Sequence, residues 1–355
     1  MLPLRWLAQA VDCPGQESSG RGTRSYHVEM SGPPTKQEAS SAAIWTALGM
    51  VYLAWGGTYL AIRVAIETLP PLLMASTRFL VAGALLYVWA VRRGDREGDR
   101  PTGRQWLAAS IIGAALLLGG NGMVTLAEQH ITSGIAALLV ATVPLWMVML
   151  ARLVLRERVG WLEWAGILIG FGGVALLAWP SGLQRINALG VTLVILASIS
   201  WAAGSLYARR APMPRRPLVG VAMEMLAGGA ALGIVGLLRG EAAQVHPESF
   251  SVESLLGLGY LIVFGSWVAF SAYVWLLRVT RTSLVSTYAY VNPIVAVVLG
   301  WLILAEPVTL RTLVAGLVIL VGVALIVSAR SPKDDAGEGE PAAGTPPLEE
   351  ERVTA

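Results

Sequence analysis

Little in this sequence could build the water-exposed surface or the reactive centre of a soluble enzyme. Charged residues make up 14% of the 355 residues, whereas 55% are hydrophobic. The one cysteine, Cys13, excludes an intramolecular disulfide and a multi-cysteine metal site. The five aspartates and three histidines fall outside the hydrophobic runs, and there is no P-loop lysine motif. We therefore expect no catalytic residue, metal or cofactor, and a chain this apolar needs lipid as its main solvent.

Ten hydrophobic runs fill the middle of the chain. A helix that crosses about 30 Å of hydrocarbon needs about 20 apolar residues. Lipid offers no water to unpaired backbone groups, so each run is predicted to be helical. The short connections predict antiparallel neighbours and an all-α integral membrane protein of ten transmembrane helices. The runs are at 44–66, 72–91, 106–127, 132–151, 160–179, 189–208, 217–238, 254–276, 283–304 and 311–328.

The two ends of the chain differ from this middle part. Residues 1–43 lack the uninterrupted apolar stretch of a signal peptide, and residues 330–355 are rich in Glu, Gly and Pro. We expect a disordered leader and a disordered tail. Met30 opens a shorter leader and offers a second translation start. Residues 44–182 and 183–329 then form two halves of five helices each.

Arginine supplies nearly all of the positive charge, and it is unequally shared between alternate loops. With a cytoplasmic N-terminus, fourteen loop arginines are inside and three, Arg185, Arg239 and Arg311, are outside. Cytoplasmic loops carry an excess of Lys and Arg. We therefore expect a bacterial inner-membrane protein with both termini in the cytoplasm. The arginines form no basic stripe with aromatic residues, so nucleic acid is not an expected partner.

The two halves resemble one another at a nearly constant spacing. The matched pairs are Trp55 with Trp201 at an offset of 146, and Pro144 with Pro293 and Glu157 with Glu306 at an offset of 149. The prolines can kink their helices. We expect the two glutamates to be exposed at helix ends, as caps or as partners of arginines. Five helices per half predict two inverted repeats, an arrangement typical of alternating access.

Four segments, WGGTYLAIR, LPPLLMASTRF, GGNGMVTLAEQHITSGIAALLVATVPL and STYAYVNPIVAVVLG, resemble the EamA branch of the drug/metabolite transporter superfamily, and within it the YedA-type members. The resemblance covers residues 44–328 and includes several polar positions. It implies a ten-helix fold of two EamA units that exports amino acids, related metabolites or toxic organic molecules. It identifies no single substrate. The long leader and the acidic tail depart from the family pattern.

Two ionisable residues fall inside predicted helices, Arg78 in the second and Glu224, its counterpart at an offset of 146, in the seventh. A charge at such depth costs about 2.5–3.5 kcal/mol on insertion scales, so it should face the bundle interior. We expect both at a substrate or coupling site. Glu224 is the expected proton carrier, since a desolvated carboxyl can exchange a proton near neutral pH and arginine stays charged. A structural contact between helices is the alternative. Arg63 and Glu67, near a helix end, can reach the interface.

Uncharged polar and aromatic residues complete the predicted site. Asn121 lies among glycines that interrupt the third helix, and Gly265–Trp267 occupies the related part of the eighth. An open backbone at membrane depth needs protein or a cavity to cover it, so we expect Asn121 to line the cavity; close packing of small residues explains the glycines nearly as well but explains the amide less well. The other candidates are Tyr288 and Asn292 on one helical face, and Trp55, Tyr59 and Trp201, for which interfacial anchoring is the alternative.

We therefore predict a secondary transporter that exports a small metabolite or toxic compound by alternating access, with proton coupling as one option. Its expected partners are a small-molecule substrate and membrane lipid. A non-transporting scaffold subunit and an integral-membrane enzyme acting on lipid-linked substrates are the alternatives. Such an enzyme would need metal-held carboxylates or an activated nucleophile, and the sequence offers neither. Substrate, direction, coupling ion and oligomeric state, a homodimer included, are left open.

Overall fold

The computed structural model describes residues 40–92, 101–179, 187–280 and 282–330, and all regular structure within these ranges is helical. Nine described helical segments are long and apolar enough to cross a membrane, and a further apolar helix, Tyr288–Leu304, is shorter. The expected all-α membrane fold is confirmed. The predicted leader and tail lie almost entirely outside the described residues.

The hydrophobic runs predicted from the sequence coincide with these helices to within a few residues. The first half contains α2 (Ser41–Ala65), α3 (Pro71–Arg92), α4 (Gly103–Gly113), η1 (Ala114–Gly122), α5 (Met123–Ala127), α6 (Ser133–Val140), α7 (Val143–Val154) and α8 (Trp161–Ala178). The second half contains α9 (Ala188–Ala208), α10 (Pro217–Leu238), η2 (Glu241–Gln244), η3 (Pro247–Ser249), α11 (Val252–Tyr260), η4 (Leu261–Val268), α12 (Ala269–Val279), α13 (Thr282–Val285), α14 (Tyr288–Leu304) and α15 (Leu310–Arg330).

Polar side chains fix several helix starts. Ser40, Thr132, Asn187 and Ser251 each accept a hydrogen bond from a backbone N–H in the first turn of α2, α6, α9 and α11, respectively. These N–H groups have no partner inside the helix, so the cap removes a cost that lipid would otherwise impose.

The helices α7 and α14 end in the same way, 149 residues apart. Arg156 and Ala305, with φ of 56° and 50°, are the two non-glycine residues with positive φ in the described chain. The next N–H, that of Glu157 or Glu306, donates to the carbonyl six residues earlier. A left-handed residue just past the last turn is a common way for a helix to end. Each half therefore presents a glutamate on the same local backbone.

Two π-helical segments also correspond between the halves. The segment η1 (Ala114–Gly122) lies inside the third crossing, and η4 (Leu261–Val268) lies inside the eighth, starting 147 residues later. They confirm the irregular backbone expected around Asn121 and Gly265. A π-helix is rare and is often found at functional sites.

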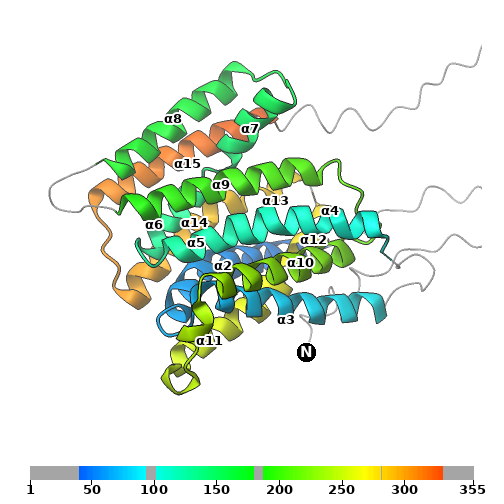
Figure 1. Ribbon diagram of the computed structural model, residues 1–355. Coiled ribbons are helices and arrows are strands. Elements are labelled where there is room, and N and C mark those ends of the chain that lie inside the picture. Colours follow the sequence, from blue (N-terminus) through cyan, green and yellow to red (C-terminus); the bar gives the residue numbers. More distant parts are fainter. Residues whose placement is uncertain (1–39, 93–100, 180–186, 281, 331–355) are drawn as a thin grey trace, which may run out of the picture.

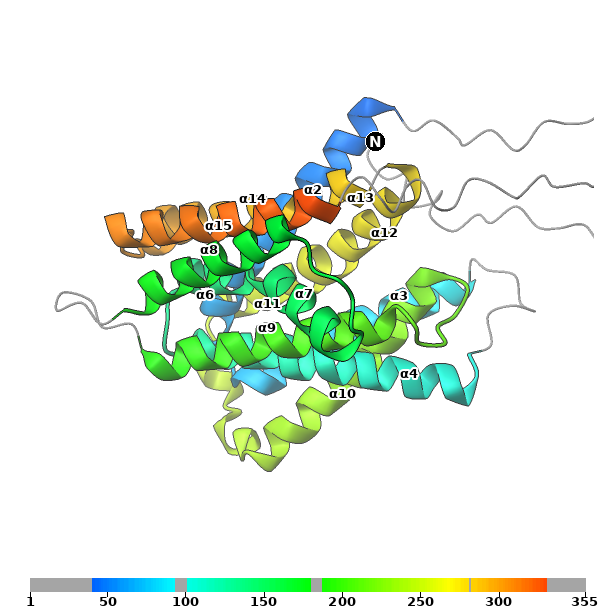
Figure 2. The same cartoon turned by 90° about the horizontal axis from the view of Figure 1, so that it is seen from above.

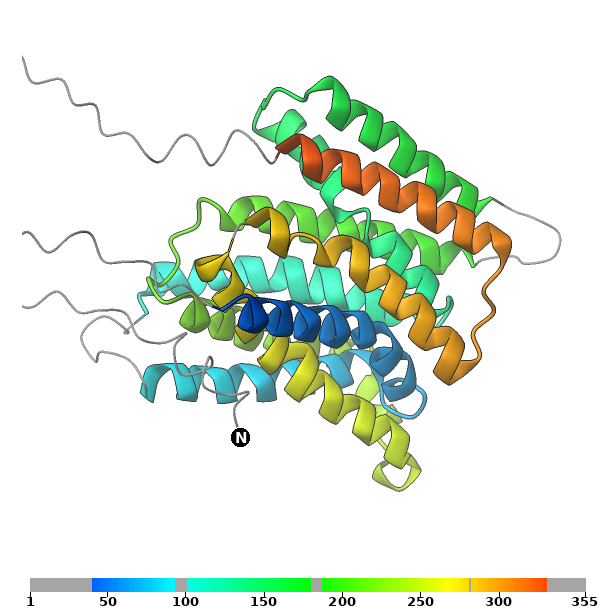
Figure 3. The same cartoon turned by 180° about the vertical axis from the view of Figure 1, so that it is seen from behind.

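The helices pack as a bundle in which sequence-distant elements are neighbours. The helix α3 packs along α10, and α8 along α15; α2 contacts α11, α12 and α14, while α9 contacts α5, α7 and η1. In Figures 1 and 3, α8 and α15 lie side by side at one edge of the bundle. Figure 2 shows α9 beside α4. Glycines permit this closeness: a Cβ on Gly166 of α8 would lie 2.6 Å from the Gly322 carbonyl oxygen of α15.

The prolines occupy different positions relative to helix breaks. The fourth crossing is interrupted between α6 and α7, just before Pro144, which is the second residue of α7. Pro293 instead lies inside α14, one turn after that helix begins. Only Pro144 therefore coincides with an interruption, as expected of a residue that fits the first turn of a helix.

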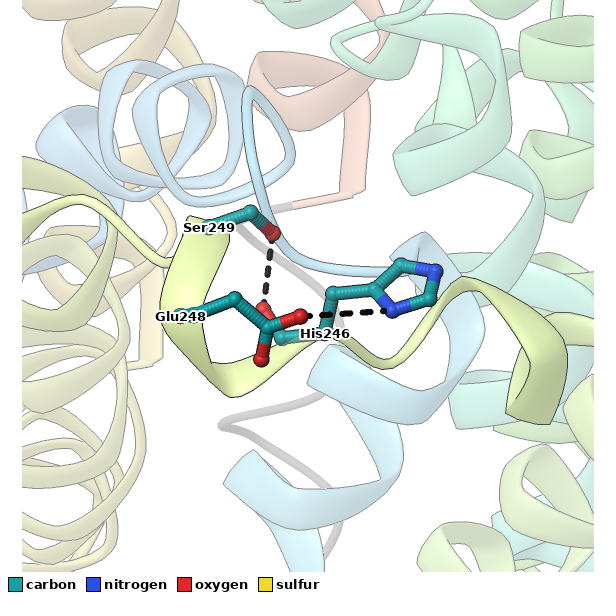
Figure 4. Close-up of polar contacts among 3 residues, drawn as sticks. All are labelled: His246, Glu248 and Ser249. Atoms are coloured by element: carbon teal, nitrogen blue, oxygen red, sulfur yellow. Dashed lines mark hydrogen bonds and ion pairs between the residues drawn. The ribbon is translucent and has the colours of Figure 1, made fainter.

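Residues 246–249, in the connection between α10 and α11, are exposed and make contacts with one another. The Ser249 hydroxyl donates to the His246 carbonyl oxygen over 2.7 Å, and His246 Nδ1 lies 3.7 Å from Glu248 Oε1 (Figure 4). The imidazole and carboxylate are 62% and 78% exposed. An ion pair this exposed contributes little to stability.

Candidate functional site

Arg78 lies inside the bundle and contacts the π-helical segment η4. Its side chain is 3% exposed. Nε donates to Ser266 Oγ over 2.9 Å, and Nη2 donates to the Gly265 carbonyl oxygen over 3.4 Å. The expectation that this charge faces protein rather than lipid is confirmed. In this conformation Arg78 joins α3 to η4.

Trp55 of α2 meets the same carbonyl group. Its Nε1 donates to the Gly265 oxygen over 3.2 Å. Its ring packs edge-on against Tyr288 of α14 and Phe270 of α12, with centroids 5.1 and 5.2 Å away. The structure thus joins three predicted residues, Trp55, Arg78 and Tyr288, around η4. We call Trp55, Arg78, Gly265, Ser266 and Tyr288 the Arg78 group.

Three buried polar atoms, one each on η4, α12 and α14, have no hydrogen-bond partner in the described part of the chain. They are Trp267 Nε1, Ser271 Oγ and Asn292 Oδ1. Buried polar groups in folded proteins are usually paired, and an unpaired one costs about 1–3 kcal/mol. Asn292 was a predicted site residue, whereas Trp267 and Ser271 were not. These atoms therefore have unused hydrogen-bonding capacity close to the Arg78 group.

The predicted residues of the other half gather around η1. The Trp201 ring packs on Gly120, where an added Cβ would lie 2.6 Å from Trp201 Cε3. Asn121 lies within η1, and half-buried Glu224 lies on α10, its backbone oxygen against Gly113. Trp201 therefore meets η1 as Trp55 meets η4. Glu224, the counterpart of Arg78, lies in this second group and not in the Arg78 group.

Glu128 is a buried carboxyl group that the sequence analysis missed. It directly follows the candidate span Gly103–Ala127, and its side chain is 0% exposed. Neither carboxylate oxygen has a hydrogen-bond partner among the described residues. Burial is the main cause that raises the pKa of Glu128 well above its ordinary value of 4.5; Glu306 adds to the shift, and Arg63 and Arg78 oppose it. The available signal was a glutamate placed directly between two apolar runs.

Arg63 and Tyr59, both on α2, are neighbours of Glu128. The Arg63 guanidinium donates to the backbone carbonyl oxygen of Glu128. Arg63 therefore binds the protein, rather than extending only to the interface as expected. Tyr59, a predicted site residue, lies within electrostatic range of the Glu128 carboxylate. Tyr59 is thus placed beside Glu128 at one end of the bundle.

Glu306 differs from its expected position. It is half-buried, and its carboxylate accepts hydrogen bonds from the backbone N–H groups of Ser133 and Gly134 and from the Ser133 hydroxyl, over 2.9, 3.2 and 3.0 Å. The expectation of an exposed residue is wrong, because the segment after α14 folds against the first turn of α6. The expectation of a cap is confirmed, since a carboxylate is favourable at a helix N-terminus.

Comparison with known proteins identifies the family. The model of the EamA-like transporter family matches residues 41–179 and again residues 188–328. The chain belongs to the EamA-like transporter family. It is 44% identical, over 259 residues that cover 72% of this chain and 81% of the relative, to the uncharacterized inner membrane transporter YedA of Escherichia coli strain K12.

More distant relatives extend the same likeness. An uncharacterized transporter of Archaeoglobus fulgidus is 25% identical over 81% of this chain and 99% of its own length. The uncharacterized transporter YvbV of Bacillus subtilis is 26% identical over 81% of this chain and 92% of its own. One solved crystal structure matches with a TM-score of 0.56 at 20% identity, covering 81% of this chain and 96% of that chain, and supports the fold. The EamA-like chain is thus a membrane transporter.

Proposed function

We propose that this EamA-like transporter exports a small organic solute across the inner membrane by alternating access between two inverted five-helix halves. The observation that carries the proposal is the correspondence of helix contacts. Exchanging the halves turns the contacts of α2 with α14, η4 and α12 into those of α9 with α7, η1 and α5, respectively. The α3–α10 and α8–α15 pairs are unchanged by the exchange. Two similar halves around a shared site are typical of alternating access.

Ten crossings are required for this arrangement. Nine come from the long apolar helices, and the tenth from α14 together with α13, which begins at Thr282. Because five is odd, the second half then enters from the opposite side of the membrane. The arginine distribution supports cytoplasmic termini. The family model, which matches each half separately, supports residues 44–182 and 183–329 as the two units.

The Arg78 group is the proposed solute site. A guanidinium can bind a carboxylate in a bidentate manner. Trp55 and Tyr288 offer ring faces and edges for the apolar part of a solute, and Asn292 offers an unpartnered buried oxygen. This combination suits an amino acid or a related organic acid. Trp201, Asn121 and Glu224, placed similarly around η1, are the second proposed part of the solute path.

The proposal is tested by transport in proteoliposomes with imposed pH and sodium gradients, using labelled amino acids, nucleobases and cationic drugs. We expect flux of at least one carboxylate-bearing solute, and we expect Arg78→Ala to reduce it about 100-fold, since a charge-assisted bidentate contact contributes roughly 1.5–3 kcal/mol. Arg239→Ala, at an exposed arginine after α10, is the matched control and should transport normally. Absence of flux for every solute class would favour a scaffold and contradict the proposal.

A further inference from the structure

We call the end of the bundle at which α2, α5, α10 and α14 finish the arginine-poor end, because few of the loop arginines lie there. It contains three glutamates that are mostly or wholly removed from solvent, and two of them accept hydrogen bonds from the first turn of a helix. Glu306 binds the first turn of α6. Glu241 Oε2 accepts hydrogen bonds from the N–H groups of Leu72 and Leu73 at the start of α3, over 2.9 and 3.0 Å. Glu128 is the exception, because both its oxygens are buried and no described residue hydrogen-bonds them. An unpaired buried charge costs several kcal/mol, so Glu128 is neutral in this conformation.

The lack of space around the Glu128 carboxyl group limits which cation can bind there. Since the Glu128 side chain is 0% exposed, no organic ammonium group can reach the carboxyl in this conformation. A metal cation would need further oxygen ligands beside one carboxyl group. A proton needs neither room nor additional ligands. It is therefore the cation that fits the occluded site.

The surrounding charges are arranged so that the proton can also leave. Arg63 on α2 and Arg78 on α3 favour the charged carboxylate, whereas Glu306, after α14, favours the neutral form. Tyr59 on α2 lies within electrostatic range of the same carboxyl group, and His130 lies exposed in the same loop. Burial outweighs the arginines and keeps the proton bound. Once water reaches the group, that penalty falls, and the two arginines favour proton release.

Access to Glu128 is closed by two contacts on either side of it. Arg63 holds the Glu128 backbone carbonyl oxygen, and Glu306 holds the N–H of Ser133, five residues further along the chain. Both contacts join the loop between α5 and α6 to other elements. Releasing them would free that loop and let water reach the carboxyl group, so opening of this end would be coupled to loss of the proton.

We propose that Glu128 is the proton-binding site of this transporter, occluded when the arginine-poor end is closed and emptied when that end opens. The inference rests on the proposed transport function, and it adds the coupling ion and its residue. The proposal assigns proton binding to Glu128 in place of Glu224, the proton carrier expected from the sequence. Glu224 is half-buried and lies with Trp201 and Asn121 around η1.

A first experiment measures proton binding without a solute. The full-length protein is labelled with ¹³C at the glutamate side-chain carboxyls, and the resonances are followed by NMR as a function of pH. We expect a carboxyl group that stays protonated well above pH 4.5, and we expect Glu128→Gln to remove that signal. Glu67→Gln, at an exposed glutamate of the same end, is the matched control and should keep it. The proposal is overturned if the late-titrating set is the same in Glu128→Gln as in the wild type.

A second experiment measures coupling. Vesicles loaded with a ¹⁴C-labelled amino-acid mixture are diluted into buffers with and without an inward proton gradient. Wild type and Glu67→Gln should release label faster with the gradient, and Glu128→Gln should lose that stimulation. Stimulation retained in Glu128→Gln overturns the proposal. Lack of any amino-acid flux in the wild type contradicts the proposed solute class, while the NMR titration still decides the role of Glu128.

Discussion

Glu157 and Glu306 occupy equivalent places in the two halves and make different contacts. Both follow a left-handed residue at the end of a helix, and both N–H groups bond the carbonyl six residues earlier. Glu306 reaches across to the first turn of α6, whereas Glu157 is exposed. The local sequence therefore forms the same turn, with a glutamate, in both halves. Of the two glutamates, it is Glu306 that contacts a helix distant in sequence. The two glutamates are therefore engaged unequally in this conformation.

Other contacts between helices gather at the end where Glu306 is engaged. Besides the contacts of Glu128 and Glu241, the Ser254 hydroxyl donates to the Val64 carbonyl oxygen, and the Ser251 N–H donates to Thr68 Oγ1. These contacts join α2, α3 and α11. Glu157 lies at the opposite, arginine-rich end, between exposed Arg156 and Arg158. We infer that the arginine-poor end is closed in this conformation.

Labelling from each side of the membrane has the largest expected effect, because the comparison of Glu157 with Glu306 requires them to lie on opposite sides. In a Cys13→Ser background, an impermeant maleimide should label Glu157→Cys only from the cytoplasmic side. It should label Glu306→Cys only from the outer side, more slowly because that position is half-buried. Glu248→Cys, at an exposed loop residue, reports the outer side. The measurement uses spheroplasts and inside-out vesicles. Labelling of both sites from one side would contradict the inverted arrangement.

Removing the carboxylate should change the free energy of unfolding by different amounts at Glu306 and at Glu157. Glu306→Ala leaves two backbone N–H groups and a hydroxyl without their acceptor. It should lower the free energy of unfolding by about 3 kcal/mol, since hydrogen bonds to a charged group contribute about 1.5–3 kcal/mol. Glu157→Ala should change it by less than about 0.5 kcal/mol, as at other exposed sites. Thermal unfolding in detergent, followed by tryptophan fluorescence, measures both. Equal destabilisation would show that the two glutamates are equally engaged.

The sequence predicts the helices well and the contacts of individual side chains less well. Lipid forces each apolar run of sufficient length to be helical, so the fold follows from hydropathy and from the repeat. Arg78 was identified because a charge at membrane depth needs partners. Its partners are a serine hydroxyl and a carbonyl oxygen in a π-helical turn, which hydropathy does not encode.

Glu128 and Glu306 show why the remainder could not be predicted. Both stand beside apolar runs in short connections, where solvent exposure is the ordinary expectation. Their burial depends on elements far away in sequence: the Glu306 partners on α6 are more than 170 residues away. The offset of 149 predicts that Glu157 and Glu306 share a local structure. It cannot predict which of them is engaged, because that depends on the conformation.

Glu128 differs from Glu306 because, within the described ranges, no group donates a hydrogen bond to its carboxyl oxygens, so its effect on stability should depend on pH. Its raised pKa means that the folded protein keeps a proton that the unfolded chain loses. Wild-type stability should therefore fall as the pH rises above 4.5, by at most about 1.4 kcal/mol per pH unit, and should level off above the folded-state pKa. In Glu128→Gln this fall should be smaller. Unfolding measured from pH 4 upward tests the sign, and an identical pH profile would contradict the neutral buried carboxyl.

The smallest expected effect concerns a single hydroxyl at the closed end. Ser254→Ala removes a donor to the Val64 carbonyl oxygen between two helices, at a side chain that is 0% exposed. Hydrogen bonds between membrane helices average about 0.6 kcal/mol, so the loss in stability should be of that size. Ser110→Ala, whose hydroxyl bonds within its own helix at an exposed position, is the matched control and should lose less. If the two variants were equal, single contacts of this kind would not hold the arginine-poor end closed, and the charged contacts of Glu306 and Glu241 would account for it.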